Sequence, residues 1–168
     1  MSINIIIDVM IMSDPSLKNA LFANDQDYLS KNHTLAKISK FIQPVNIQEK
    51  KTFGICMNGG AVYKNAVTGM TDISLKILER NNMELTDVNW LLVHQANQRI
   101  THAIAERLQI PLNRIMESIE ECANTSVATI PISLDKYVRH NSELKHGDVI
   151  LMATAGSGMT FSSCIVRW

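Results

Sequence analysis

The stretch Trp90-Leu91-Leu92-Val93-His94-Gln95-Ala96-Asn97-Gln98-Arg99 decides the fold of this chain. Its first four residues are continuously apolar, which predicts a strand covered on both faces, as in a parallel or mixed sheet between helices. Helical spacing follows, because Ile100, Ile104 and Leu108 recur at steps of four. A strand followed directly by a helix predicts a layered α/β domain, with polar residues at the end of the buried strand.

The rest of the chain continues the α/β order. Residues 3–12 predict a strand, and residues 16–50 predict an irregular excursion with one short helix near 35–41. The other expected elements are helices at about 60–80, 98–108 and 126–139 and strands at 90–93, 115–119, 149–154 and 160–168. We expect the last two strands to be adjacent and antiparallel.

The helix expected at 126–139 carries apolar residues on most sides, so we expect it to be central in the domain. The residues that give it this apolar character are Val127, Ala128, Ile130, Leu134 and Val138. Pro131 falls near its first turn, where a missing N–H is least costly.

The composition is typical of a soluble globular domain. Of 168 residues, 46% are apolar and 19% charged, and 16 basic residues balance 16 acidic ones, so nothing drives general binding to nucleic acid or anionic membrane. Three cysteines without CxxC spacing predict neither a disulfide framework nor a structural metal site. The start lacks a basic region, and no apolar run approaches the roughly 20 residues of a membrane span. A reducing cytoplasm or plastid stroma fits these features.

Two polar positions can jointly hold a carbonyl oxygen. His94 ends the buried strand, and Asn124 opens the later triplet Asn124-Thr125-Ser126. Imidazole and carboxamide groups are neutral hydrogen-bond donors, which stabilise a developing oxyanion without a buried charge. Taken singly, such a histidine is more often an ordinary core residue, and such an asparagine is more often a helix cap.

Four blocks occur together in the chain: MNGGAVYK at 57–64, HQANQRI at 94–100, NTS at 124–126, and the ending that begins GSGMTF at 156–161. Their order and spacing resemble the C-terminal half of β-ketoacyl-acyl carrier protein synthase III, in the thiolase-fold superfamily. The resemblance covers 53–168 closely and 1–52 loosely. It implies one half of an αβαβα layered sandwich with a mixed sheet, in which a junction strand and excursion over 1–52 pack with the 53–168 domain as one compact unit.

The resemblance also implies an acyltransferase that begins fatty acid biosynthesis. An acyl group passes from coenzyme A to a cysteine, and malonyl-acyl carrier protein is decarboxylated to a carbanion that attacks the thioester. The implied partners are acyl carrier protein, acyl-coenzyme A, malonyl-acyl carrier protein and a further chain, either a second copy in a dimer or an N-terminal partner. Coenzyme A thioester is a substrate, and no permanently bound cofactor or metal is implied.

The family pattern assigns roles to residues of this chain. His94 and Asn124 would be catalytic, holding the enolate oxygen. The turn Gly156-Ser157-Gly158 would offer a backbone N–H to a second oxyanion, and Ser157 would be strained if this position needs a positive φ. Residues implied to line the coenzyme A and pantetheine tunnel are Asn58, Gly59, Gly60, Tyr63, Ala96 and Asn97. Residues implied to bind acyl carrier protein are Lys64, Arg99 and Arg107.

The nucleophile of the family lies on a strand-to-helix turn of the N-terminal half. Cys56, Cys122 and Cys164 lack a helix start immediately after them, so we expect each to be a small buried residue. Three accounts remain open: half of a split or heteromeric synthase, a truncated non-catalytic binding or structural subunit, or a fragment of a longer gene. In each, the isolated chain is expected to be inactive, and the uncovered face of a half-sandwich favours association.

Overall fold

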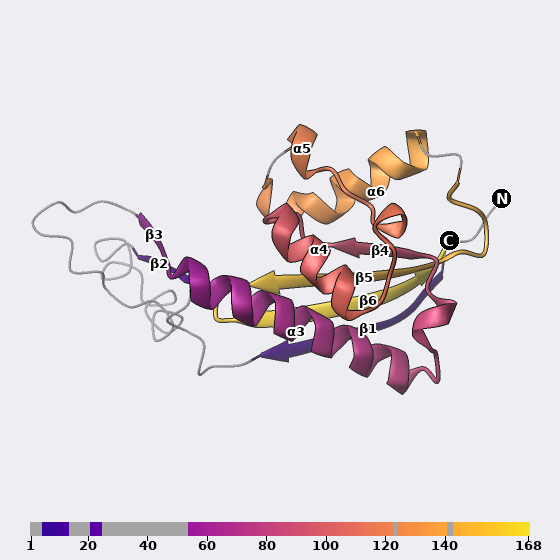
Figure 1. Ribbon diagram of the computed structural model, residues 1–168, viewed down its shortest axis with the longest axis horizontal. Coiled ribbons are helices and arrows are strands. Elements are labelled where there is room, and N and C mark those ends of the chain that lie inside the picture. Colours follow the sequence, from indigo (N-terminus) through magenta and orange to yellow (C-terminus); the bar gives the residue numbers. More distant parts are fainter. Residues whose placement is uncertain (1–4, 14–20, 25–53, 123, 141–142) are drawn as a thin grey trace, which may run out of the picture. The chain divides into compact units, whose positions relative to one another are not determined.

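The structure is a computed structural model that describes residues 5–13, 21–24, 54–122, 124–140 and 143–168. The chain divides into two units, and Figure 1 labels the described helices and strands. The first unit contains Met1–Met12, Ala66–Ala155 and Phe161–Trp168. The second unit contains Ser13–Asn65 and Gly156–Thr160.

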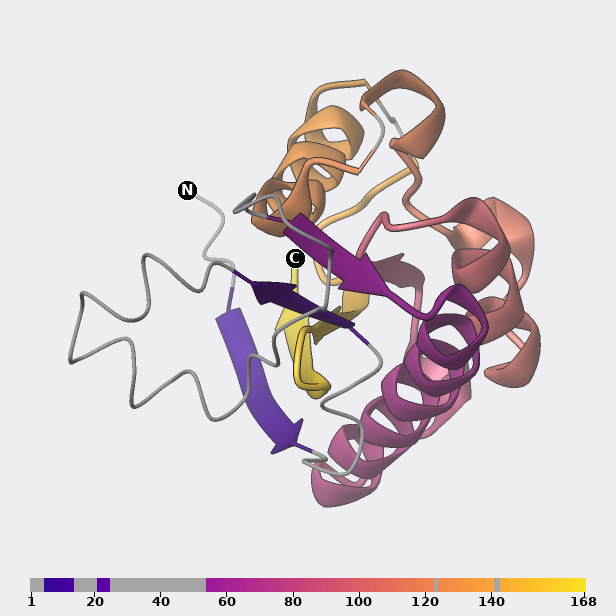
Figure 2. The ribbon, with the colours of Figure 1, turned by 90° about the vertical axis from the view of Figure 1, so that its left-hand side faces the viewer.

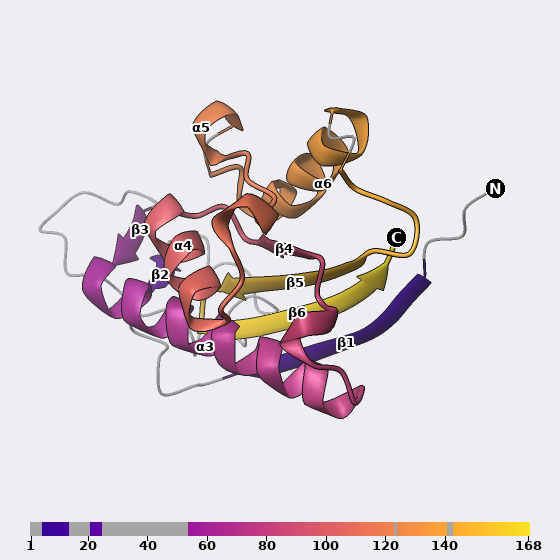
Figure 3. The ribbon, with the colours of Figure 1, turned by 45° about the vertical axis from the view of Figure 1, so that its right-hand side comes forward.

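A four-stranded sheet forms the centre of the first unit. Its strands follow the order β1-β6-β5-β4, with bounds Ile5–Ser13 for β1, Trp90–Val93 for β4, Val149–Gly156 for β5 and Thr160–Arg167 for β6. Strand β4 pairs with β5 in parallel, with Trp90 opposite Ile150. The β5 and β6 arrows run in opposite directions (Figure 3). The sheet is therefore mixed, as the sequence predicts.

Helices lie on both faces of this sheet. The described helices are α3 (Gly59–Arg80), α4 (Gln98–Arg107), α5 (Ile119–Cys122) and α6 (Thr129–His140). Helices α3 and α4 lie on one side of the sheet and α6 on the other (Figure 2). No helix in the described part of the chain is long and apolar enough to cross a membrane.

The core is built around β4, whose four residues are all buried. Side chains alternate along a strand, so Trp90 and Leu92 share one face of it. They pack with Ile150 and Met116. Residues of α6 cover this cluster, and the Tyr137 ring meets Trp90 edge-on at 5.8 Å between centroids. Helix α6 therefore lies on the sheet through apolar contacts.

The second unit contains a short antiparallel pair. Strand β2 (Leu21–Asn24) pairs with β3 (Gly54–Met57). The expectation of an irregular excursion over 16–50 is therefore wrong at 21–24, because this strand is completed by a partner about 30 residues later. The helix expected near 35–41 lies outside the described residues.

Most predicted elements of the first unit are confirmed, and two details are wrong. Ile115 forms a single parallel bridge with Leu91, and Ile119 already begins α5, so no strand spans 115–119. Val127, expected within the helix at 126–139, lies outside α6 and is 92% exposed. It belongs to a separate 3-10 turn, Ser126–Ala128, whose tighter winding breaks the periodicity of α6.

Helix α3 packs against β6 at Gly69. A methyl group added there would lie 2.3 Å from Cζ of Phe161, whose ring is fully buried. Glycine at this position therefore permits the helix and the strand to pack at this distance.

We expect Gly69→Ala to destabilise the protein by about 1 to 2 kcal/mol in urea unfolding. Alanine favours a helix over glycine by roughly 0.5–1 kcal/mol, but overpacking a core costs roughly 1–3 kcal/mol. Gly60→Ala is the control, because its added methyl group would meet no atom closer than 3.8 Å. Adding Phe161→Leu to Gly69→Ala should recover part of the loss. An unchanged midpoint for Gly69→Ala would contradict the close packing.

Candidate functional site

His94 lies directly after β4 and remains tied to the sheet by its backbone. Its N–H donates to the carbonyl of Ala153 at 2.9 Å. Its ring is half-buried, and Nδ1 lies 2.6 Å from Oγ1 of Thr129, the first residue of α6. Burial lowers the pKa of His94 below its ordinary value, so the imidazole is neutral at neutral pH.

Asn124 lies on the turn that precedes α6. Its Oδ1 accepts the backbone N–H of Ser126 at 2.9 Å, and Ser126 has a φ of 56°. The side chain is exposed, and its oxygen is occupied by this turn. The amide N–H2 donates to no described residue. His94 contacts Thr129, where α6 begins, and Asn124 lies on the turn before that helix. A shared catalytic role of His94 and Asn124 stays a prediction.

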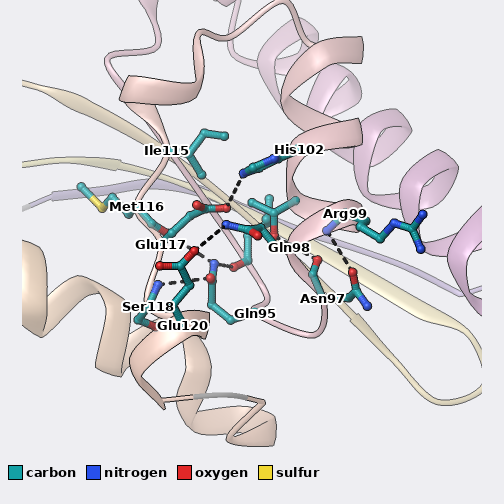
Figure 4. A network of polar contacts seen from close by, with 12 residues as sticks. Gln95, Asn97, Gln98, Arg99, His102, Ile115, Met116, Glu117, Ser118 and Glu120 are labelled. Atoms are coloured by element: carbon teal, nitrogen blue, oxygen red, sulfur yellow. Dashed lines mark hydrogen bonds and ion pairs between the residues drawn. The ribbon is translucent and has the colours of Figure 1, made fainter.

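A buried amide holds the segment after β4. Gln95 is fully buried, and its Nε2 donates to the carbonyls of Val93 at 2.7 Å and Met116 at 3.3 Å (Figure 4). Its Oε1 accepts the N–H of Ser118 at 3.3 Å. Gln95 thus fastens the 115–118 segment to the end of β4. The HQANQRI block contains Gln95, but the sequence predicted no role for it, although a glutamine two residues past a buried strand is a signal for one.

The predicted tunnel residues belong to different units. Asn97 caps α4, because its Oδ1 accepts the N–H of Arg99 at 2.9 Å, and Ala96 precedes it. In the second unit, Asn58 caps α3 by accepting the N–H of Ala61 at 3.1 Å. Tyr63 is exposed one turn further along α3. Asn58 and Asn97 therefore each cap the start of a helix, which explains an asparagine at both positions. A tunnel lined by both segments stays a prediction.

The predicted basic residues are all exposed. Arg99 and Arg107 lie on α4, and Arg107 donates from Nη1 to Oγ1 of Thr68 at 3.2 Å. Lys64 lies on the part of α3 that belongs to the second unit. Their exposure is compatible with docking of acyl carrier protein, which stays a prediction.

The turn between β5 and β6 accommodates its serine. The left-handed φ of this turn, 130°, falls on Gly158 and not on Ser157. The strain considered for Ser157 is therefore absent, and its backbone N–H stays compatible with the predicted oxyanion role.

Neither cysteine whose side chain is described has the features of a nucleophile. Cys122 ends the short helix α5, and Cys164 lies within β6. Burial, and then the charge of Asp8, raise the pKa of the Cys164 thiol, which disfavours the thiolate. Cys56 lies within β3, two residues before Asn58 at the start of α3. The described residues also contain no group of three or more His, Cys, Asp and Glu residues that fits a metal ion.

Comparison with known proteins identifies the family of this chain. Residues 78–168 match the family described as 3-Oxoacyl-[acyl-carrier-protein (ACP)] synthase III C terminal. The chain belongs to this family. Synthase III of Ehrlichia canis is 42% identical over 113 residues, 67% of this chain and 35% of that protein. Synthase III of Synechocystis sp. is 43% identical over 114 residues, 68% of this chain and 34% of that protein.

A solved synthase III structure from Aquifex aeolicus is also similar. It aligns with a TM-score of 0.76 and 28% identity, covering 97% of this chain and 44% of that one. The α/β thiolase-like fold of this synthase III family member is thereby confirmed. The chain spans about a third of the length of the curated relatives it matches.

We expect Gln95→Leu to lower the free energy of unfolding by about 3 kcal/mol, measured by urea denaturation. Leucine fills a similar volume but leaves the N–H of Ser118 and two carbonyls without their partner, at about 1 kcal/mol or more each. Gln98→Ala is the control, because Gln98 has only an exposed contact with Glu120 at 3.3 Å, and its loss should cost under about 0.5 kcal/mol. Equal effects of the two variants would contradict a bracing role for Gln95.

We expect His94 to make stability depend on pH. Because burial lowers its pKa, the unfolded chain binds a proton on this residue at a higher pH than the folded chain does. The free energy of unfolding should therefore fall as the pH drops through the window below about 6.5. His94→Gln should show a shallower fall between about pH 7 and pH 5. A wild-type slope in His94→Gln would refute this effect.

Proposed function

We propose that this chain supplies the decarboxylating part of a 3-oxoacyl-[acyl-carrier-protein] synthase III, which condenses acyl-coenzyme A with malonyl-acyl carrier protein. The observation that carries the proposal is the contact of His94 with Thr129, the first residue of α6, in a chain of this family whose Asn124 lies on the turn before that helix. The relatives named synthase III support the same reaction.

The chemistry of decarboxylation suits these two side chains. When carbon dioxide leaves the malonyl group, the electron pair of the broken C–C bond passes into an enolate whose charge lies on the thioester oxygen. Neutral donors from His94 and Asn124 stabilise that oxygen without placing a fixed charge in a half-buried site. Each such donor contributes roughly 2.7–4 kcal/mol to barrier lowering. The enolate carbon then attacks the acyl thioester, and the cysteine thiolate leaves.

The acyl-carrying cysteine is proposed to come from a second region that covers the exposed apolar residues of β1. On β1, the carboxylate of Asp8 accepts a hydrogen bond from Arg80 of α3 at 2.6 Å, so Asp8 lies on the face of the strand toward that helix. Residues Val9 and Ile11 alternate with Asp8 and so lie on the opposite face, where they are 49% and 71% exposed. An N-terminal synthase region, in a partner chain or in the same protein, is the proposed cover, with dimer formation a consequence.

The remaining assignments follow the family. Acyl carrier protein is acidic, and the exposed Lys64, Arg99 and Arg107 are proposed to bind it. Coenzyme A thioester is the proposed substrate, without a permanently bound cofactor. A cytoplasmic or plastid-stromal site of action is part of the same proposal, in which neither nucleic acid nor membrane is a partner.

A non-catalytic thiolase-fold subunit is the second candidate. It is favoured by Cys122 and Cys164, which lie on a helix end and inside a strand rather than on a strand-to-helix turn.

One experiment separates the two candidates. The chain is co-expressed with the N-terminal region of the Ehrlichia canis relative that precedes the matched part, and release of labelled carbon dioxide from malonyl-acyl carrier protein is measured. We expect activity in the complex and a roughly 10²- to 10³-fold loss in His94→Ala or Asn124→Ala. His140→Ala and Asn113→Ala, both at exposed positions, are the matched controls.

The isolated chain should take no label from radiolabelled acetyl-coenzyme A. Label on Cys56, Cys122 or Cys164 would contradict the proposed origin of the nucleophile. A folded complex without any decarboxylation would favour the non-catalytic subunit.

A further inference from the structure

The hydroxyl of Thr129 is the polar partner of the His94 ring. Oγ1 of Thr129 lies 2.6 Å from Nδ1 of His94, and Thr129 is fully buried. A hydroxyl can either donate its proton to an unprotonated Nδ1 or accept a proton from a protonated one. The two arrangements put the single proton of the neutral imidazole on different nitrogens, Nε2 in the first case and Nδ1 in the second.

Hydrogen-bond accounting favours the first arrangement. If Oγ1 of Thr129 accepted from Nδ1, its own O–H would need another acceptor, and the described residues provide none besides His94. A buried hydroxyl proton without an acceptor is unfavourable. If Thr129 instead donates to Nδ1, its proton is satisfied and Nδ1 is an acceptor.

We propose that Thr129 is a positioning residue that donates its hydroxyl proton to Nδ1 of His94 and so keeps the imidazole proton on Nε2. No described residue forms a hydrogen bond with Nε2, so that N–H is available to a bound carbonyl oxygen. The consequence for catalysis rests on the proposed function, in which His94 must donate to the thioester oxygen.

A second set of contacts fixes Thr129 in place. Its carbonyl accepts the hydroxyl of Ser133 at 2.8 Å, and the Ser133 oxygen lies 2.5 Å from the hydroxyl of Ser118. Ser118 is joined in turn to Gln95, next to His94 in the chain. The first turn of α6 is thus tied to the end of β4 by side chains that are all buried. This closed path restricts the ring of His94 relative to the hydroxyl that orients it.

The neutral state that this arrangement requires has independent support. An imidazolium carries a proton on both nitrogens, and Nδ1–H would then face the hydroxyl proton. Burial of the ring acts in the same direction, because it lowers the pKa of His94. No charged side chain forms an ion pair with His94 among the described residues, and the element packed against it, α6, presents the uncharged Thr129 and Ser133 there.

The test is the tautomer of His94 in the folded chain, read from nitrogen chemical shifts and two-bond proton–nitrogen correlations of ¹⁵N-histidine-labelled protein above the pKa. We expect wild-type protein to carry the proton on Nε2. Thr129→Ser retains the hydroxyl and should retain this tautomer. Thr129→Val removes the hydroxyl at nearly constant volume and should give a mixture. A proton on Nδ1 in the wild type, or an unchanged tautomer in folded Thr129→Val, would overturn the proposal.

The tautomer of His94 can be measured without any catalytic turnover. If Thr129→Val does not fold, the wild-type protein and Thr129→Ser still decide the tautomer. In an active complex, Thr129→Val should lower kcat by roughly 10- to 100-fold with little change in KM, because only the orientation of the His94 donor changes. Thr129→Ser keeps the hydroxyl and should therefore keep kcat near the wild-type value. The Nε2 tautomer in a complex that does not decarboxylate would leave this proposal standing and overturn the proposed function.

Discussion

The parallel pairing of β4 with β5 is the constraint on which the rest of the first unit depends. All four residues of β4 are buried, so every backbone polar group needs a protein partner. On one edge, β5 supplies the partners, and the ladder continues to the N–H of His94. On the other edge, the N–H of Met116 donates to the carbonyl of Leu91 at 2.8 Å. The position of the histidine is therefore set by the register of the sheet.

Helix α6 has two functions that are physically coupled. One side covers the Trp90 cluster with Ile130, Leu134 and Tyr137. Its first turn presents Thr129 to His94 and Ser133 to Ser118. Apolar packing of the helix thus fixes the distance between polar groups at its start. A loss of packing at Leu134 would therefore disturb the contact between Thr129 and His94. The polar contacts use hydroxyls and amides, which tolerate burial better than charges do.

The sequence was most informative where a single element carries the signal. The continuous apolar run predicted that β4 is buried in a parallel or mixed sheet, and the steps of four predicted α4. His94 and Asn124 came from a resemblance between blocks of sequence. Thr129, Gln95 and Ser118 were not predicted as a network, because their contacts join segments 20 to 35 residues apart, which periodicity does not reveal. Val127 was misplaced since the helical period does not extend through the preceding 3-10 turn.

The strand order also has a consequence for biosynthesis. Strand β1 pairs with β6, so residues 5–13 find their sheet neighbour only at 160–167. At ribosomal rates of about 5–20 residues per second, β1 emerges roughly 7 to 30 s before β6 exists. During that interval its apolar residues Ile6, Val9 and Ile11 have neither a ladder nor a covering layer. A nascent chain of this kind is a natural client for a chaperone that holds extended apolar segments until translation reaches the final hairpin.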